Sequence, residues 1–151
     1  MIESHETILA VEDEDDDVAL LKRAFRKVGI PNPVTFLADG DAATEYLAGE
    51  GRYADRSAYP LPALMLLDLK LPKKSGLDVL AWMQEQPVVR RIPVVVLTSS
   101  RQSRDLERAY DLGANSYLVK PVAFEDLLKM IDALKVYWLT FNEPVRAQQR
   151  P

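Results

Sequence analysis

The chain has 151 residues, of which 48% are hydrophobic and 28% charged, as expected for about one globular domain. Its formal net charge of −4 argues against nucleic-acid binding, which requires a basic face. The sequence lacks cysteine, and no apolar run reaches the roughly 18–20 residues of a membrane span. Because residues 1–7 are polar and acidic, we expect no signal peptide, no membrane partner and a cytoplasmic location.

Short apolar runs alternate along the chain with longer amphipathic stretches. In chain order we predict strand 8–11, helix 17–28, strand 34–37, helix 41–47, strand 64–67, helix 77–85, strand 94–97, helix 103–112, strand 117–119 and helix 124–139. Four of the five strands are apolar without alternation, which indicates burial on both faces. This order predicts an α/β fold with a five-stranded parallel sheet flanked by five helices.

A single long loop, residues 49–62, interrupts this alternation, and its tyrosines Tyr53 and Tyr59 are expected to anchor it. We expect one domain over residues 1–140 and a polar C-terminal tail over residues 141–151, with no output domain.

Polar side chains follow four of the predicted strands at their carboxyl ends. They are Glu12 and Asp13, Asp68, Thr98 and Lys120. In doubly wound sheets, ligands bind outside this edge, so these side chains are expected to meet. A cluster of carboxylates repels itself and is relieved by a divalent cation, for which Mg²⁺ with its oxygen ligands is suitable. Asp68 would then be a nucleophile towards phosphorus, with Lys120 and Thr98 stabilising the aspartyl phosphate.

Four segments resemble, in order and spacing, the response-regulator receiver domain, also called the chemotaxis-regulator fold. They are VEDEDDD (11–17), LLDLKLPKKSG (66–76), VVVLTSS (94–100) and YLVKP (117–121). The resemblance covers roughly residues 7–135 and implies a doubly wound sheet with strand order 2-1-3-4-5. It also implies a signalling module that is not itself an enzyme, and that accepts a phosphoryl group from a sensor histidine kinase.

The resemblance implies a role for each matched residue. Asp68 would accept the phosphoryl group; Asp13 would bind Mg²⁺ directly, Glu12 through water, and Lys70 through its backbone carbonyl. Thr98 and Lys120 would bond the phosphate, and Tyr117 would be the aromatic switch that turns inward with Thr98. The bond between Lys120 and Pro121 is expected to be cis. The Lys70 side chain departs from the family pattern, which puts the lifetime of the phosphate in question.

The long loop and the aromatic C-terminal segment also resemble the small regulators encoded with bacterial phytochrome kinases. The similar segments are GRYADRSAYPLP (51–62), LPKKSG (71–76), RRIPVVVLTSS (90–100) and YWLTF (137–141). This likeness implies a phytochrome, a light-regulated histidine kinase, as phosphodonor. The module would pass its phosphoryl group to a histidine phosphotransfer protein or act as a phosphate sink for its kinase.

Other interpretations remain open. A haloacid-dehalogenase phosphatase also uses a strand-end Asp with Mg²⁺, but it needs a second Asp where this chain has Lys70. A degenerate receiver would bind partners without phosphorylation, although the complete set of acidic residues, Thr98 and Lys120 argues against it. Asp68 could merely cap a turn, and Tyr117 could merely pack. Asp15 to Asp17 are expected to cap and charge the first helix.

The last predicted helix is longer than the strands and overhangs the sheet. Its core stripe is expected to be Leu127, Leu128, Ile131, Leu134 and Trp138. Tyr137, Trp138 and Phe141 at its end either cover the domain itself or form a partner surface. We favour a homodimer through the last strand and its flanking helices.

Overall fold

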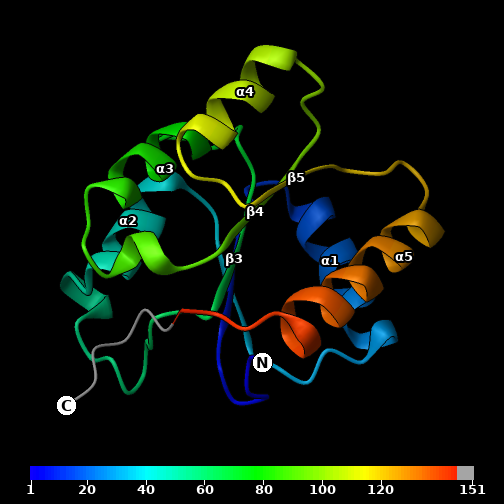
Figure 1. The fold of residues 1–151 in the computed structure, drawn as a ribbon, viewed down its shortest axis with the longest axis horizontal. Helices are drawn as coiled ribbons and strands as arrows, with labels where there is room; N and C mark the ends of the chain where they lie inside the picture. Colours follow the sequence, from blue (N-terminus) through cyan, green and yellow to red (C-terminus); the bar gives the residue numbers. More distant parts are fainter. Residues whose placement is uncertain (146–151) are drawn as a thin grey trace.

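The computed structural model describes residues 1–145, which form a parallel sheet between two layers of helices (Figure 1). The strands are β1 (Ile8–Val11), β2 (Val34–Leu37), β3 (Leu64–Leu67), β4 (Val94–Thr98) and β5 (Ser116–Val119). The helices are α1 (Asp15–Val28), α2 (Gly40–Ala48), α3 (Gly76–Gln84), α4 (Ser103–Asp111) and α5 (Phe124–Leu134). All neighbouring strands are parallel in the order β2-β1-β3-β4-β5, so the predicted fold class and strand order are confirmed.

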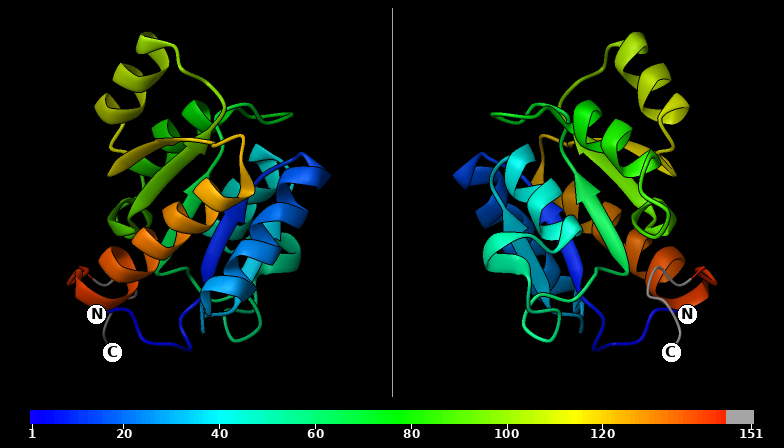
Figure 2. Two further views of the ribbon diagram at one scale, coloured as in Figure 1. Left: turned by 90° about the vertical axis from the view of Figure 1, so that its right-hand side faces the viewer. Right: turned by 90° about the vertical axis from the view of Figure 1, so that its left-hand side faces the viewer.

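Successive side chains of each central strand enter different cores, because strand side chains alternate between the two faces of a sheet. In β1, Leu9 and Val11 pack with α2 and α3, whereas Ile8 and Ala10 pack with α1 and α5. Figure 2 shows these two helical layers on opposite sides of the sheet. Strand order reverses between β1 and β3, which opens the crevice at their carboxyl ends where ligands bind in such folds.

Helix α1 begins at Asp15, two residues before the predicted start. Its first turn contains Asp15, Asp16 and Asp17, where negative charge interacts favourably with the positive end of the helix dipole. None of the three is the N-cap, which is Glu14, so the expected charging of the first turn is confirmed but not the capping. The helix ends at Gly29, whose φ of 79° lies in the left-handed region that glycine enters without strain.

The long loop is anchored by tyrosines, as predicted. Tyr53 is buried, and its ring centroid lies 5.2 Å from those of both Tyr46 on α2 and Tyr59. The Tyr46 hydroxyl donates to the Pro60 carbonyl at 2.8 Å. Arg56 adds a polar anchor, because its guanidinium donates to carbonyl oxygens at the C-terminal end of α2. This loop therefore caps α2 and extends the core on that face.

The chain after α5 differs from the predicted helix over 124–139. Helix α5 ends at Leu134, and residues Lys135–Phe141 form a π-helical segment with wider turns. Trp138 is 8% exposed and packs in the α1/α5 core, so its assignment to a partner surface was wrong, whereas Tyr137 and Phe141 are 58% and 74% exposed. The expected core position of Trp138 is therefore confirmed, although the helical pattern did not predict the wider turns after Leu134.

The predicted tail over residues 141–151 falls outside the described residues from position 146 onward. Within residues 1–145, no helix combines the length and apolar character needed to cross a bilayer.

Replacement of Arg56 by Ala tests the loop anchor. Nη1 donates to the Tyr46 carbonyl at 2.7 Å and Nη2 to the Leu47 carbonyl at 2.7 Å. Loss of Arg56 removes two charge-assisted hydrogen bonds to the end of α2, although the Gly49 N–H still donates to the Tyr46 carbonyl. We therefore expect the free energy of unfolding to fall by about 1.5–3 kcal/mol. The matched control, Arg52→Ala, removes an exposed arginine of the same loop whose guanidinium lies over the Tyr53 ring, 5.3 Å from its centroid. Equal losses in urea denaturation for the two variants would contradict this role.

Candidate functional site

Backbone register brings the predicted site residues together at the carboxyl edge of the sheet. Val11 of β1 pairs with Leu67 of β3, so the residues that follow, Glu12 and Asp68, lie side by side. The Asp68 N–H donates to the Val11 carbonyl at 3.1 Å, which continues the ladder to the site. On the other flank, the Lys120 N–H donates to the Thr98 carbonyl at 2.8 Å. The sheet itself therefore sets the spacing of the site.

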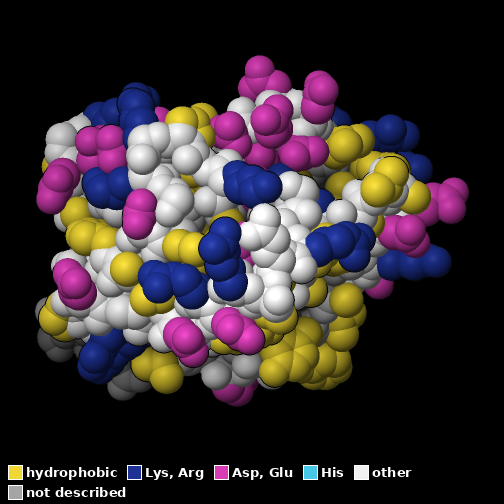
Figure 3. Space-filling model, turned by 90° about the horizontal axis from the view of Figure 1, so that it is seen from above, with side chains coloured by type: hydrophobic (Ala, Val, Ile, Leu, Met, Phe, Trp, Pro, Cys, Tyr) yellow, Lys and Arg dark blue, Asp and Glu magenta, His cyan; other side chains and the backbone are white. Residues whose placement is uncertain are grey.

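Three carboxylates form a group suited to a divalent cation. One oxygen each of Glu12, Asp13 and Asp68 lies within 4.8 Å of the other two. Glu12 and Asp68 are 3% and 5% exposed, and Asp13 is half-buried. A close set of carboxylate oxygens with one side open fits a hard cation that keeps part of its water shell. Figure 3 looks down on this edge and shows a gathering of Asp and Glu side chains with Lys and Arg beside it.

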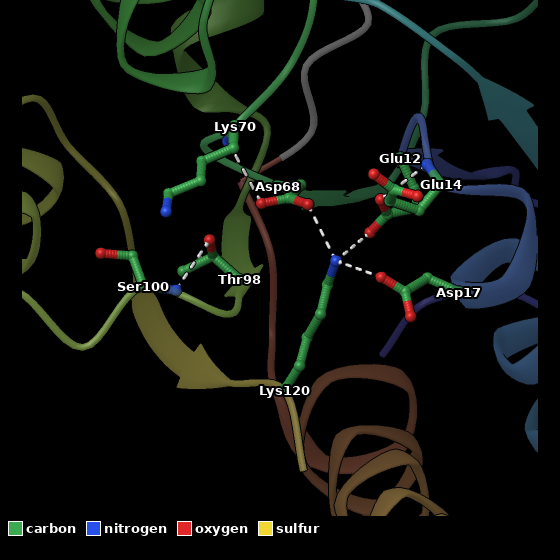
Figure 4. A network of polar contacts seen from close by, with 8 residues as sticks. All are labelled: Glu12, Glu14, Asp17, Asp68, Lys70, Thr98, Ser100 and Lys120. Atoms are coloured by element: carbon green, nitrogen blue, oxygen red, sulfur yellow. Dashed lines mark hydrogen bonds and ion pairs between the residues drawn. The ribbon is translucent and has the colours of Figure 1, made fainter. Parts of the chain in front are cut away.

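The Lys120 ammonium contacts two of these carboxylates, those of Glu12 and Asp68, as Figure 4 shows. Its Nζ lies 2.8 Å from Asp68 Oδ2 and also forms an ion pair with Glu12. A third carboxylate, Asp17 Oδ2 on α1, lies 2.9 Å away. The sequence interpretation missed this contact and assigned Asp17 to the helix terminus alone. Asp17 follows Asp13 by four residues and lies in the first turn of α1, and this closeness to the sheet edge could have predicted the contact.

In this cluster, burial and the ion pairs with Lys120 shift pKa values in opposite directions. Burial raises the pKa of Glu12 to about 7, and the nearby Asp68 charge adds to the rise, although Lys120 acts in the opposite direction. Burial alone would lower the pKa of Lys120, but its bonds to Asp68, Glu12 and Asp17 outweigh burial and raise it. Lys120 therefore stays charged, but its single positive charge does not balance the carboxylates around it. A divalent cation would supply the additional positive charge.

The backbone after Asp68 is held by close approaches to neighbouring helices. The Lys70 N–H donates to Asp68 Oδ1 at 3.2 Å and so orients the carboxylate. At Gly76, the first residue of α3, a Cβ atom would lie 2.2 Å from the Asp68 carbonyl oxygen. At Gly40 of α2, a Cβ atom would lie 2.0 Å from the Lys74 carbonyl oxygen. Two glycines therefore let α2 and α3 clamp the loop that contains Lys70. A Lys70 carbonyl ligand stays a prediction.

Thr98, the last residue of β4, and Tyr117 of β5 lie on the other side of the site, next to the loop between β4 and α4. Thr98 is fully buried, and its Oγ1 accepts from the Ser100 N–H at 3.4 Å. The half-buried Tyr117 donates its hydroxyl to the Ser100 carbonyl at 3.0 Å. Burial raises the pKa of Tyr117, which keeps this hydroxyl a donor. Both residues thus contact the same loop residue, and their joint switching stays a prediction.

The expected cis bond before Pro121 is wrong, because every peptide bond within residues 1–145 is trans. Trans is the lower-energy isomer even before proline, and Lys120 reaches all of its carboxylate partners in that form.

Comparisons with known proteins agree on one family. The family model described as the response regulator receiver domain matches residues 8–132. The chain is 44% identical over 135 residues to the probable methanogenesis regulatory protein FilR2 of Methanothrix harundinacea, covering 89% of this chain and 84% of that protein. It is 41% identical over 132 residues to response regulator Rcp1 of a Synechocystis species, covering 87% and 88% of the two chains.

Solved structures give the same result. The phosphorylated cyanobacterial phytochrome response regulator RcpA is similar with a TM-score of 0.86 and 37% identity, covering 93% of this chain and 98% of that one. The Mn²⁺-bound form of Rcp1 has a TM-score of 0.83 and 38% identity, covering 93% and 99%.

The crowding of carboxylates predicts opposite effects for two neighbouring acids. Asp13→Asn should raise the metal-free free energy of unfolding by a few tenths to about 1 kcal/mol, because it removes a like charge from the cluster. The same change should weaken Mg²⁺ binding at least about tenfold, since it removes a charged ligand.

Asp16→Asn is the matched control, because Asp16 is exposed and without an ion pair among residues 1–145. It should lose about 0.3–1 kcal/mol of helix-dipole stabilisation and leave Mg²⁺ affinity unchanged. Thermal unfolding with and without Mg²⁺ measures both quantities. A metal affinity of Asp13→Asn equal to that of the wild type would remove Asp13 from the site.

Proposed function

This chain belongs to the response regulator receiver domain family, and on that premise we propose that Asp68 accepts a phosphoryl group from a sensor histidine kinase. The observation that supports this most is the meeting of Asp68 with Lys120, Glu12 and Asp13 at the edge where strand order reverses. A residue that only capped a turn would not need a buried ammonium at 2.8 Å. The proposed output is a change in protein contacts.

The chain's own residues account for the positioning that the transfer requires. An Asp68 carboxylate oxygen forms the new O–P bond while the P–N bond to the donor histidine breaks, and the imidazole leaves with the bonding pair. Lys120 is already beside Asp68 and offers positive charge to the oxygens of the transferred group. Thr98, at the end of β4, would donate its hydroxyl to the same group. Phosphoryl transfer depends mainly on such positioning and charge stabilisation.

We propose Mg²⁺ as the cation, held by Asp13 and Asp68 directly, by Glu12 through water and by the Lys70 carbonyl. When bound, the cation supplies positive charge that offsets both the carboxylates and the phosphoryl oxygens. The three-carboxylate group supports this choice. The Mn²⁺-bound form of the related Rcp1 supports a divalent cation without deciding its identity.

The proposed phosphodonor is a phytochrome-type kinase. RcpA, a cyanobacterial phytochrome response regulator, supports this choice because it is similar to this chain over nearly its whole length, as is Rcp1. Sequence identity alone does not identify the stimulus, because FilR2, whose name refers to methanogenesis, is 44% identical to this chain and Rcp1 is 41% identical. We further propose that the domain either passes its phosphoryl group to a histidine phosphotransfer protein or acts as a phosphate sink for its kinase. Its cytoplasmic location, the lack of an enzymatic activity of its own and the effect of Lys70 on phosphate lifetime stay predictions.

Acetyl phosphate with Mg²⁺ tests the acceptor directly. We expect intact-protein mass spectrometry to show one added phosphoryl group on the wild type and none on Asp68→Asn, because the amide oxygen is a poor nucleophile. Asp111→Asn, at the exposed end of α4, is the control and should be modified like the wild type. Modification of Asp68→Asn at the wild-type level would overturn the assignment. Repeating the assay with a purified phytochrome kinase in place of acetyl phosphate tests the donor.

We also propose a homodimer formed through β5 and its flanking helices. Tyr137 and Phe141 support it, because both are large, strongly exposed and close in sequence at the end of the domain. Val136, 44% exposed, extends the same apolar surface. Beneath this surface, the ring of Trp138 packs against that of Tyr137 with centroids 5.1 Å apart.

Replacement of Tyr137 and Phe141 by Ser should weaken a dimer that depends on them, and sedimentation velocity over a range of concentrations measures it. We expect a dimer for the wild type and a monomer for the double variant, because the change removes the apolar area that would be buried. The control is Leu20→Ser on α1, which removes an exposed apolar side chain from a helix outside the proposed interface. A wild-type monomer, or an equal effect of the control and the double variant, would contradict this interface.

A further inference from the structure

The ammonium group of Lys120 has no unused hydrogen in this structure. A lysine ammonium offers three N–H donors. Within residues 1–145, three different carboxylates surround it: Glu12, Asp17 at 2.9 Å and Asp68 at 2.8 Å. Each comes from a different element, namely the end of β1, the first turn of α1 and the end of β3 (Figure 4). A further acceptor can bind Lys120 only if one of these partners withdraws.

The three partners differ sharply in what withdrawal would cost. The side chains of Glu12 and Asp68 are 3% and 6% exposed, so neither can exchange the ammonium for water without leaving a buried charge unsolvated. The Asp17 side chain is 36% exposed. Because it lies at the surface of α1, it can turn towards water, and an ion pair of this exposure is worth little.

The surroundings of the pair leave room for this exchange. A cavity of about 30 Å³ lies beside it, lined by residues that include Asp17, Leu21, Lys120 and Pro121. That volume is enough for a water molecule, which could solvate the released carboxylate. The other acids of the same turn behave differently, since Asp15 and Asp16 are exposed and form no ion pair within the described part of the chain.

We propose that Asp17 is a positioning residue that occupies, in the unphosphorylated protein, the place on the Lys120 ammonium that a phosphoryl oxygen takes on Asp68 phosphorylation. The inference rests on the proposed function and adds a competitor to it. Asp17 keeps the ammonium directed at the site before transfer, and it opposes the phosphorylated state afterwards. The exchange makes and breaks only hydrogen bonds and ion pairs. Asp17 therefore affects the equilibrium between the unphosphorylated and phosphorylated states and takes no part in forming the O–P bond.

Competition predicts a gain on removal, which a purely structural role does not. Asp17→Asn, with Asp17→Ala as second variant, should bind beryllium fluoride in the presence of Mg²⁺ about two- to fivefold more tightly than the wild type, the range expected for loss of one partly exposed ion pair. Asp16→Asn and Asp16→Ala are matched controls, because each removes the same charge from the same helical turn. Isothermal titration with beryllium fluoride at constant Mg²⁺ measures the affinities.

Each outcome decides the proposal. Tighter binding by the Asp17 variants than by the Asp16 variants supports exchange. Equal binding by the two pairs overturns it, because the effect would then be one of net charge. Weaker binding by the Asp17 variants also overturns it, since Asp17 would then hold Lys120 in both states. If the wild type itself does not bind beryllium fluoride, the proposed function fails and not merely this inference.

The increase in melting temperature on adding beryllium fluoride with Mg²⁺ gives a second readout on the same proteins. It should be larger for Asp17→Ala than for Asp16→Ala, because a competitor stabilises only the free state. An equal or smaller increase would overturn the exchange.

Discussion

One half-buried ammonium group among four carboxylates is the constraint around which the carboxyl edge of the sheet is organised. Lys120 brings one positive charge to a site where Glu12, Asp13, Asp17 and Asp68 bring four negative charges. Burial of such an excess is unfavourable without further positive charge. Burial raises the pKa of Glu12 to about 7, and the neighbouring Asp68 charge adds to this rise. A bound cation would therefore relieve a strain that the metal-free cluster carries.

The rest of the fold makes this crowding possible by leaving the site residues little freedom. Glu12 and Asp68 directly follow paired strands, so the backbone ladder holds their separation. Gly76 lets α3 approach the backbone of Asp68, and no larger residue fits there. The two apolar cores on either face keep the strands in register. A mobile cluster would spread its charges into water and lose its affinity for a cation.

The far side of the site is less constrained, and this difference suits a signalling domain. Helix α4 buries only Ala109, and its preceding loop is held by polar contacts of Ser100 with Thr98 and Tyr117. Elements with few buried apolar contacts open at lower free energy than core strands. The β4–α4 region is therefore expected to open more readily than the β1–β3 ladder.

The sequence by itself determined the features that follow from local pattern. Short apolar runs identified the five strands, and the polar residues at the ends of four of them identified the site, because parallel strands end at a common edge. These residues are Glu12, Asp13, Asp68, Thr98 and Lys120. Tertiary structure decided contacts between distant segments. Asp17 meets Lys120 across 103 positions, which no helical pattern within α1 contains. The π-helical turns after Leu134 and the trans bond before Pro121 were likewise decided by the assembled fold, because no local sequence pattern predicts either of them.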